Sequence, residues 1–252
     1  ILDDSAPFHV LKDTGEIRAI APIDRESHPE PFVFVVQAYD GSTPRKSGSA
    51  TVTVNVVDAN DNPPACAWRR WQFDISEAAP LNTTVGWVAA SDSDSGANAM
   101  VSFALVGNHS DGPFGIGASD GRLWLRRSLD RESQDRYELR SLTSECSVLI
   151  SVLDVNDNDP VPAAATFEFD VRVNEVVGAL LGGIFAWDPD AGRNGSVTYS
   201  VLPGTAGDST GSSYIRLNDS ETSSGFVYLK RSLTGWQPGQ TISAAVVATD
   251  GG

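Results

Sequence analysis

The sequence predicts an all-β chain of β-sandwich units in tandem, and three observations support this fold class. Apolar and polar residues alternate with a period of two, which is typical of half-buried strands. Glycine-centred turns separate these short stretches, and about seven strands per hundred residues is typical of a β-sandwich. An acidic motif recurs at a domain-sized distance, which indicates repeated units. No long stretch with the 3.6-residue period of a helix competes with these patterns.

The alternating segments predict strands near the end of the first two units and near the start of the third. The first two segments each lead directly into a stretch rich in Asp and Asn, which we expect to link one unit to the next. The alternating apolar positions are Val52, Val54 and Val56; Val148, Ile150 and Val152; and Phe167, Phe169, Val171 and Val173.

Gly-centred turns at residues 13–16, 119–122 and 224–225 are each expected to precede a strand, with strands over 122–125 and 226–229. Gly117 to Gly121 also fits the Gly-x-Ser-x-Gly pattern of hydrolases, which works only at a strand-to-helix elbow. Because this segment joins two predicted strands, we expect a hairpin there and no enzymatic activity.

Repeated acidic motifs define the predicted units. An Asp-x-Asn-Asp-Asn motif begins at Asp58 and recurs 96 positions later at Asp154. Asp92 and Asp188, each opening an Asp-x-Asp-x-Gly motif, keep the same spacing. We therefore expect units over residues 1–62, 63–159 and 160–252.

Two of these units are expected to be partial. The first would lack its N-terminal strands and the third its last strand. The middle unit would be shortened near its last two strands, since Glu132 and Asp154 are 22 positions apart whereas Glu26 and Asp58 are 32 apart. The start is acidic and unlike a signal peptide. We therefore expect a piece of a longer array, or an incomplete gene model.

The sequence argues against nucleic-acid binding and against a membrane-spanning segment. The formal net charge is −15, which disfavours nucleic acid because binding its phosphates depends on Lys and Arg. The longest apolar run, residues 176–187, is shorter than the roughly 20 residues that a membrane-spanning helix needs. Cationic partners are favoured, and no membrane segment is expected within the chain.

Cysteine use and glycosylation motifs bear on the compartment. Cys66 and Cys146 are either two buried thiols or a single bridge between an early and a late strand of one unit. Four Asn-x-Ser/Thr motifs favour the secretory route. They begin at Asn82, Asn108, Asn194 and Asn218.

Any single Asp- and Asn-rich stretch predicts an ordinary turn. Here five acidic motifs recur in the same order between strands, and carboxylates gathered at one junction would repel one another unless a cation separated them. Ca²⁺ binds six to eight oxygen ligands of these types. An EF-hand is excluded, because the sixth position counted from Asp92 or Asp188 is Ala97 or Arg193 rather than Gly.

Together the Asp-x-Asn-Asp-Asn, Leu-Asp-Arg-Glu, Asp-x-Asp-x-Gly and Ala-x-Asp-Gly motifs, with a Glu on the first strand, resemble those of extracellular cadherin repeats. The resemblance implies Greek-key, immunoglobulin-like β-sandwiches whose linkers each bind three Ca²⁺ ions and stiffen the array. It implies calcium-dependent cell–cell adhesion through other cadherin ectodomains, on the extracellular side of the plasma membrane, in a membrane-anchored parent. The alternatives are a non-adhesive spacer in a long atypical cadherin and an accessory module of an extracellular enzyme.

The resemblance also implies ligands at the second linker. Two ions would be held by Glu77, Asp130, Glu132, Asp154, Asp157, Asp190 and the Val155 carbonyl. A third would be held by Asn156, Asp188, Asp190, Asp250 and the carbonyls of Asn158 and Asn194. The corresponding residues of the first linker are Asp24, Glu26, Asp58, Ala59, Asn60, Asp61, Asn62, Asp92, Asp94 and Asn98.

Departures from the family pattern lead to three further expectations. The middle unit has no counterpart of Asp40 and Asp250, so the third ion of the first linker has either a weakened or empty site or Glu145 as a substitute ligand. Residues 233–235 replace Leu-Asp-Arg-Glu in the third unit, so we expect its exit to bind fewer ions and to bend more easily. Trp68 and Trp71 are expected to pack in a core or between units.

Overall fold

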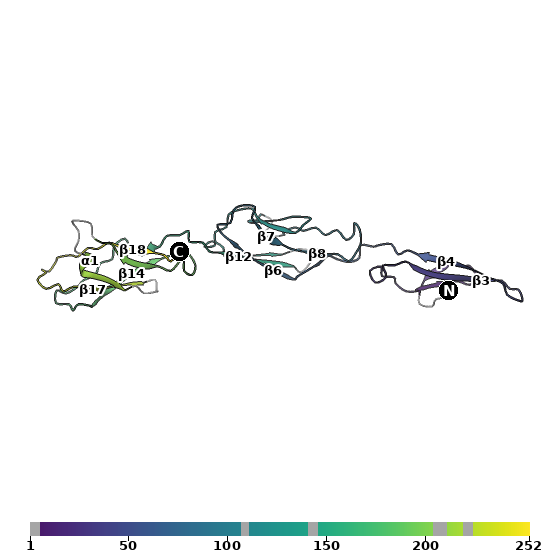
Figure 1. The fold of residues 1–252 in the computed structure, drawn as a ribbon, viewed down its shortest axis with the longest axis horizontal. Coiled ribbons are helices and arrows are strands. Elements are labelled where there is room, and N and C mark those ends of the chain that lie inside the picture. The colour runs from purple at the N-terminus through teal and green to yellow at the C-terminus, as the bar shows by residue number, and fades with distance from the viewer. Residues whose placement is uncertain (1–5, 107–110, 141–145, 204–210, 219–223) are drawn as a thin grey trace.

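The structure is a computed structural model that describes residues 6–106, 111–140, 146–203, 211–218 and 224–252. Three groups of strands follow one another along one long axis (Figure 1). A short stretch of chain joins each group to the next, and the C-terminus lies beside the junction of the second and third groups (Figure 1). In the described residues, no helix is long and apolar enough to cross a membrane.

The first group contains two antiparallel strand pairs, β1 with β2 and β3 with β4. Phe8 stacks on Phe34 at a centroid distance of 5.5 Å and meets the edge of Phe32 at 5.4 Å, which joins the two pairs. The strands are β1 (Phe8–Val10), β2 (Ile17–Ala19), β3 (Phe32–Tyr39) and β4 (Ser47–Val54).

The middle group contains sheets in the orders β11-β12-β6, β7-β10-β9 and β5-β8. Strand β6 runs parallel to β12, which brings an early strand beside the last strand of the unit. Phe114, Leu123, Leu125 and Ile150 form the fully buried centre of its core. The strands are β5 (Ala65–Cys66), β6 (Arg70–Ser76), β7 (Thr84–Trp87), β8 (Ala90–Ser91), β9 (Phe114–Ile116), β10 (Arg122–Leu125), β11 (Arg136–Arg140) and β12 (Ser147–Leu153).

The third group contains a four-stranded sheet, β13-β14-β17-β16, and the pair β15-β18. Ile184, Ala186, Val197, Tyr199 and Val227 form its buried core. The elements are β13 (Val161–Pro162), β14 (Leu180–Trp187), β15 (Thr198–Val201), α1 (Gly211–Tyr214), β16 (Ile215–Asn218), β17 (Ser224–Leu229) and β18 (Val246–Thr249).

The period-two prediction is confirmed where a partner strand is present. Val148, Ile150 and Val152 on β12 are 7%, 0% and 6% exposed, and β12 lies between β11 and β6. The predicted strand over 167–173 is wrong, because the structure has no strand there. In the middle unit β6 pairs with β12, whereas in the third unit the last strand within the described residues, β18, pairs with β15. An alternating segment without a neighbour to complete its hydrogen bonds does not form a ladder.

The predicted hairpin at residues 117–121 is confirmed. β9 and β10 are antiparallel neighbours on either side of it. Gly121 has φ of +64°, and a Cβ at this position would collide with the Val88 carbonyl oxygen. A residue with positive φ whose Cβ would collide with a neighbouring backbone carbonyl requires glycine.

The predicted turn at residues 224–225 is wrong, because both residues belong to β17. Gly225 is opposite Ile184 in the sheet, and a Cβ there would lie 2.9 Å from the Tyr199 ring. The glycine therefore allows close packing within the sandwich rather than a change of chain direction.

Cys66 on β5 and Cys146, one residue before β12, form a disulfide with a Cα–Cα distance of 6.3 Å. Of the two alternatives from the sequence, the single bridge between an early and a late strand is the one present. Trp71 packs against the core of the middle unit as expected. Trp68 is 69% exposed, so the expected packing is wrong for that residue.

Candidate metal centre

Acidic side chains from two neighbouring units meet at each linker. At the second linker, Glu77, Glu132 and Asp154 each place one carboxylate oxygen within 4.8 Å of the other two. Glu132 also belongs to a second group of this kind, together with Asp157 and Asp190. Since Asp190 follows β14 of the third unit whereas the others precede that unit, the cluster spans the junction.

Two backbone N–H groups from other parts of the middle unit hold the Glu77 side chain in place. It follows β6 directly and is only 7% exposed. Its Oε2 accepts a hydrogen bond from the Arg131 N–H at 2.7 Å, and its Oε1 accepts one from the Val155 N–H at 2.7 Å. Its carboxylate is therefore oriented by the protein itself.

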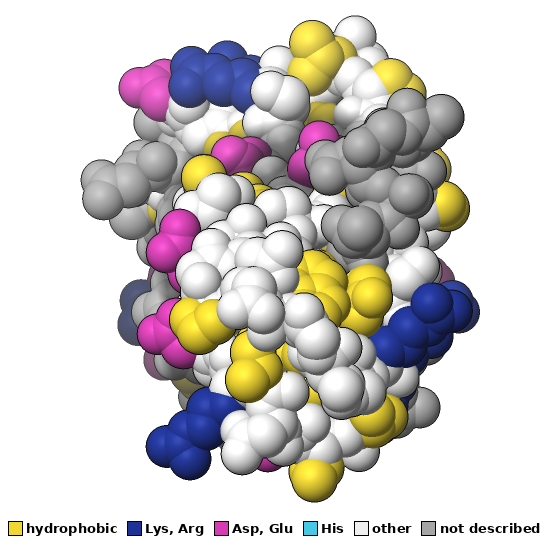
Figure 2. All heavy atoms as spheres, turned by 90° about the vertical axis from the view of Figure 1, so that its left-hand side faces the viewer, with side chains coloured by type: hydrophobic (Ala, Val, Ile, Leu, Met, Phe, Trp, Pro, Cys, Tyr) yellow, Lys and Arg dark blue, Asp and Glu magenta, His cyan; other side chains and the backbone are white. Residues whose placement is uncertain are grey.

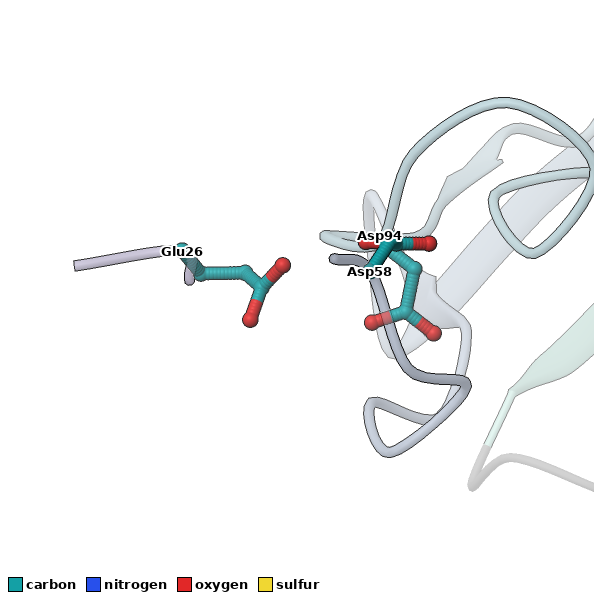
Figure 3. Close-up of side chains that lie close together, drawn as sticks. All are labelled: Glu26, Asp58 and Asp94. Carbon is teal, nitrogen blue, oxygen red and sulfur yellow. The ribbon is translucent and has the colours of Figure 1, made fainter. Parts of the chain in front are cut away.

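At the first linker, Glu26, Asp58 and Asp94 form a corresponding group with ligand oxygens within 4.8 Å of one another. Glu26 extends from the first unit toward Asp58 and Asp94, whose carboxylates lie near each other (Figure 3). Asp94 belongs to the middle unit and is 6% exposed. This group therefore also combines residues of two units.

The same asparagine contacts orient carboxylates at both linkers. Asn62 donates to Asp94 and Asn158 donates to Asp190, each at 2.7 Å. One further pair of contacts also recurs with the 96-residue spacing: Asn98 to Asp58 and Asn194 to Asp154, each at 2.9 Å. The two linkers thus share one hydrogen-bonding framework, in which Asp94 Oδ2 accepts no hydrogen bond from the described part of the chain whereas both oxygens of Asp154 and of Asp190 accept at least one.

The second cluster is electrostatically unfavourable on its own. Loss of hydration raises the pKa of Asp157, and four neighbouring carboxylates raise it further. These belong to Glu77, Asp190, Asp130 and Asp154. Burial also raises the pKa of Glu132, and the negative charge of Glu77 adds to that increase. A cation among these groups would relieve both effects.

Three buried carboxylate oxygens accept no hydrogen bond among the described residues: Asp58 Oδ1, Asp94 Oδ2 and Asp188 Oδ2. Of these, Asp58 Oδ1 lies 3.2 Å from Arg25 Nη1. Burying a charged oxygen without a partner is unfavourable unless a cation compensates. The surrounding donors are carboxylate and amide oxygens, which suit a hard divalent cation such as Ca²⁺. The residues present therefore fit a calcium ion.

Other expected ligands lie at the linkers in different arrangements. Asn156 donates to Asp250 Oδ1 at 2.9 Å, so these two expected ligands of the third ion are adjacent. Asp188 Oδ1 accepts the Asp190 N–H at 2.9 Å, and Asp92 Oδ1 accepts the Asp94 N–H at 3.0 Å. The expected ligands of the third ion at the second linker are thus in contact in two pairs, and Asp92 and Asp94 form the corresponding pair at the first linker.

Several expected ligands are outside the three carboxylate groups. Asp24 and Asp130 each accept hydrogen bonds from the serine three positions later, Ser27 and Ser133. The Ala59 carbonyl accepts the Asp61 N–H at 3.0 Å. Asn60 is exposed. Glu145 lies outside the described residues, so its role as a substitute ligand stays a prediction.

Sequence reasoning missed the role of Arg131. Its guanidinium pairs with Asp154 and Glu132, and its Nη2 donates to the Pro189 carbonyl at 2.9 Å, across the linker. Burial lowers the pKa of Arg131, but its interactions with Asp154 and Glu132 together outweigh this, so the pKa is raised. Arg25 pairs with Asp58 and Glu26 at 3.2 Å in the same way. The sequence contained a signal for this role, because an Arg stands between Asp and Glu in both the 24–26 and the 130–132 motif.

Comparison with known proteins agrees with this architecture. The cadherin-domain family model matches residues 71–153. The Fat-like cadherin-related tumor suppressor homolog of Drosophila melanogaster is 36% identical over 208 residues, which is 79% of this chain and 4% of that protein. Cadherin EGF LAG seven-pass G-type receptor 3 of Homo sapiens is 35% identical over 81% of this chain and 6% of its own length. The chain thus spans only a few per cent of these relatives.

Solved structures show the same fold over nearly the whole chain. Mouse cadherin-23 EC22-24 has a TM-score of 0.79 and 30% identity, covering 98% of this chain and 78% of that one. The protocadherin gamma B4 extracellular domain has a TM-score of 0.79 and 27% identity, covering 99% of this chain and 42% of that one. The predicted all-β, immunoglobulin-like fold is confirmed, and these relatives are cadherins and adhesion receptors rather than enzymes. The chain belongs to the cadherin superfamily.

Proposed function

We propose that this chain is part of the extracellular region of a membrane-anchored, calcium-dependent adhesion protein, with units over 1–62, 63–159 and 160–252. The observation that supports this is the convergence of carboxylates from both neighbouring units at each linker. Glu132 lies in two carboxylate groups at once, one of which includes Asp190 of the next unit. A cation between them would connect the two units directly.

The mechanism follows from charge and geometry. Without a cation, repulsion among Asp157, Glu132 and Asp190 pushes the two units apart. With Ca²⁺ bound, the same oxygens attract one ion and the linker has one preferred arrangement. We assign a third ion of the second linker to Asn156, Asp188, Asp190 and Asp250. The two ions nearest the middle unit are assigned to Glu77, Asp130, Glu132, Asp154, Asp157, Asp190 and the Val155 carbonyl. Asp58, Glu26 and Asp94 would begin the corresponding site at the first linker.

The exit from the third unit differs in composition. Leu233 is 3% exposed and Leu129 is 8% exposed, so both motifs begin with a buried leucine. Three residues after the leucine, however, the third unit has Trp236 where the middle unit has Glu132. Trp236 packs edge-on against Tyr214 at a centroid distance of 5.3 Å. Basic, acidic and hydrophobic side chains are interspersed on the end of the unit that faces away from the second linker (Figure 2). This supports the expectation of fewer ions at that exit.

Replacing Asp157 with Asn is expected to weaken calcium binding at the second linker on the order of tenfold or more, because ligand charge sets affinity in such sites. Isothermal titration of the whole chain with CaCl₂ measures this. Asp13→Asn is a matched control, since it removes one charge from an exposed turn of the first unit. Equal calcium affinity for D157N and D13N would show that the Asp157 carboxylate does not hold an ion.

Adhesion itself has a direct assay. Beads coated with this chain are expected to clump in millimolar calcium and to disperse when the calcium is chelated, if contacts with other cadherin ectodomains involve these units. D157N beads should need more calcium to clump, whereas D13N beads should behave like the unchanged protein. Beads that stay dispersed in calcium would place the adhesive contact outside this chain.

A further inference from the structure

Two of the four glycosylation motifs have side chains that the structure describes, and their surroundings are opposite. Asn108 lies outside the described residues, and the side chain of Asn218 is not described. Asn82 and Asn194 remain. Asn82 lies in an exposed turn before β7, whereas Asn194 lies at the second linker.

The backbone holds Asn82 so that its side chain remains available. Its N–H donates to the Leu125 carbonyl at 2.8 Å, and its carbonyl accepts the Arg122 Nη2 at 3.1 Å. Its φ of 69° is a left-handed conformation that Asn tolerates well. No hydrogen bond among the described residues uses its side chain, which is exposed. The amide therefore has space for a bulky substituent on a fixed backbone.

The side chain of Asn194 is partly buried, and its amide is already engaged. Its Nδ2 donates to Asp154 Oδ2 at 2.9 Å and so helps to orient a proposed calcium ligand. The adjacent residue, Gly195, is packed so closely that a Cβ there would collide with the Asp190 carbonyl oxygen. A Cβ on Gly251 would lie 2.6 Å from the Arg193 carbonyl oxygen. A sugar on Asn194 would be attached to the same Nδ2 that donates to Asp154, within a closely packed part of the linker.

We propose that Asn82 carries an N-linked glycan in the folded, secreted protein and that Asn194 does not, although both have the acceptor motif. The co-reactant is an oligosaccharide linked to a lipid pyrophosphate. Asn82 Nδ2 attacks the anomeric carbon and loses one proton, the new C–N bond replaces the C–O bond to pyrophosphate, and the lipid pyrophosphate leaves. The proposal rests on the extracellular location proposed above, and it does not depend on calcium binding.

The test is the mass of the chain secreted from cultured animal cells, before and after peptide N-glycosidase treatment. Ser110→Ala and Ser220→Ala remove the motifs at Asn108 and Asn218, which leaves the two described sites. The expected result is the loss of one glycan on treatment. Asn82→Asp, which keeps a residue tolerant of the left-handed conformation, should abolish the shift. Ser196→Ala, which leaves Asn194 in place, should not change it.

A glycan that persists in N82D, or that disappears in S196A, would overturn the assignment, as would secreted protein without any glycan.

A matched variant tests the steric argument at the first linker. Asn98 bonds Asp58 as Asn194 bonds Asp154, and Met100, which is 80% exposed, is the position where Thr would complete a motif. Secreted M100T is expected to lack sugar on Asn98. Secreted M100T that carries sugar on Asn98 and binds calcium normally would contradict the argument. Calcium titration of the unchanged protein separates this outcome from a failure of the proposed function.

Discussion

Chelating calcium is expected to convert the chain from a stiff rod into a flexible series of three units. At the second linker, Glu77, Glu132, Asp154, Asp157 and Asp190 would then face one another without a cation. The remaining bonds across the linker, such as Arg131 to the Pro189 carbonyl, are single contacts that permit rotation. Loss of the ions should therefore release bending at both linkers while the strands of each unit stay paired.

The size of this effect depends on several sites acting together. Extracellular calcium modules bind with dissociation constants of roughly 10⁻⁴ to 10⁻³ M, so millimolar calcium contributes roughly 0.4 to 1.4 kcal/mol per site. The contribution of one such site is comparable to thermal energy, which is about 0.6 kcal/mol. Two or three ions that share ligands such as Glu132 add up to a linker that rarely bends.

Small-angle X-ray scattering with millimolar calcium and then with excess chelator measures this change. The longest dimension should fall and its distribution should broaden on chelation. Asp157→Asn combined with Asp190→Asn should show part of that broadening even in calcium, because only the second linker is disabled. A scattering profile that is the same with and without chelator would refute stiffening by calcium, whatever the affinity of the sites.

The strands that sequence could predict are those whose partners are also within the described chain. Val148, Ile150 and Val152 were predictable because β12 is buried on one face and paired on both sides. The pattern over 167–173 is as regular, yet it forms no strand, because strand formation depends on a neighbour and not on alternation alone. Gly225 shows the same limit: its role depends on Tyr199, which is distant in sequence.

The candidate site was predictable to a similar degree. Repetition of acidic motifs located the clusters at the linkers, because carboxylate chemistry and spacing are visible in sequence. The position of Arg131 within the second cluster was not predictable, since a long side chain can point toward solvent or toward its neighbours. The backbone hydrogen bonds to Glu77 depend on how β6 and β12 pair, which is likewise a property of the folded unit.

Removing the disulfide is expected to cause a large loss of stability in the middle unit. Cys66 and Cys146 are 80 residues apart, so the bridge closes most of that unit into one loop. Closing a loop of this length restricts the unfolded chain and contributes about 4 kcal/mol. Domains of this size are typically stable by only about 5–15 kcal/mol, so the loss would be a large fraction of the total.

The position of the bridge adds to this expectation. It joins β5 to the residue before β12, and β12 is the central strand of the sheet β11-β12-β6. Strand β11 has five residues, compared with eight in β3 of the first unit, so fewer ladder bonds hold that hairpin. The covalent link thus fixes the start of a strand whose hairpin partner is short.

Denaturant unfolding of Cys66→Ser with Cys146→Ser, followed by tryptophan fluorescence, measures the loss. The middle unit contains Trp68, Trp71, Trp87 and Trp124, four of the six tryptophans, so its transition dominates the signal. The third unit contains no cysteine and holds the other two tryptophans, Trp187 and Trp236, so it serves as the internal control when the unchanged protein is treated with a reductant. If the double variant does not fold, reduction of the folded protein still reports the change through its unfolding rate. An unaltered transition of the middle unit after complete reduction would mean that its packed core alone determines its stability.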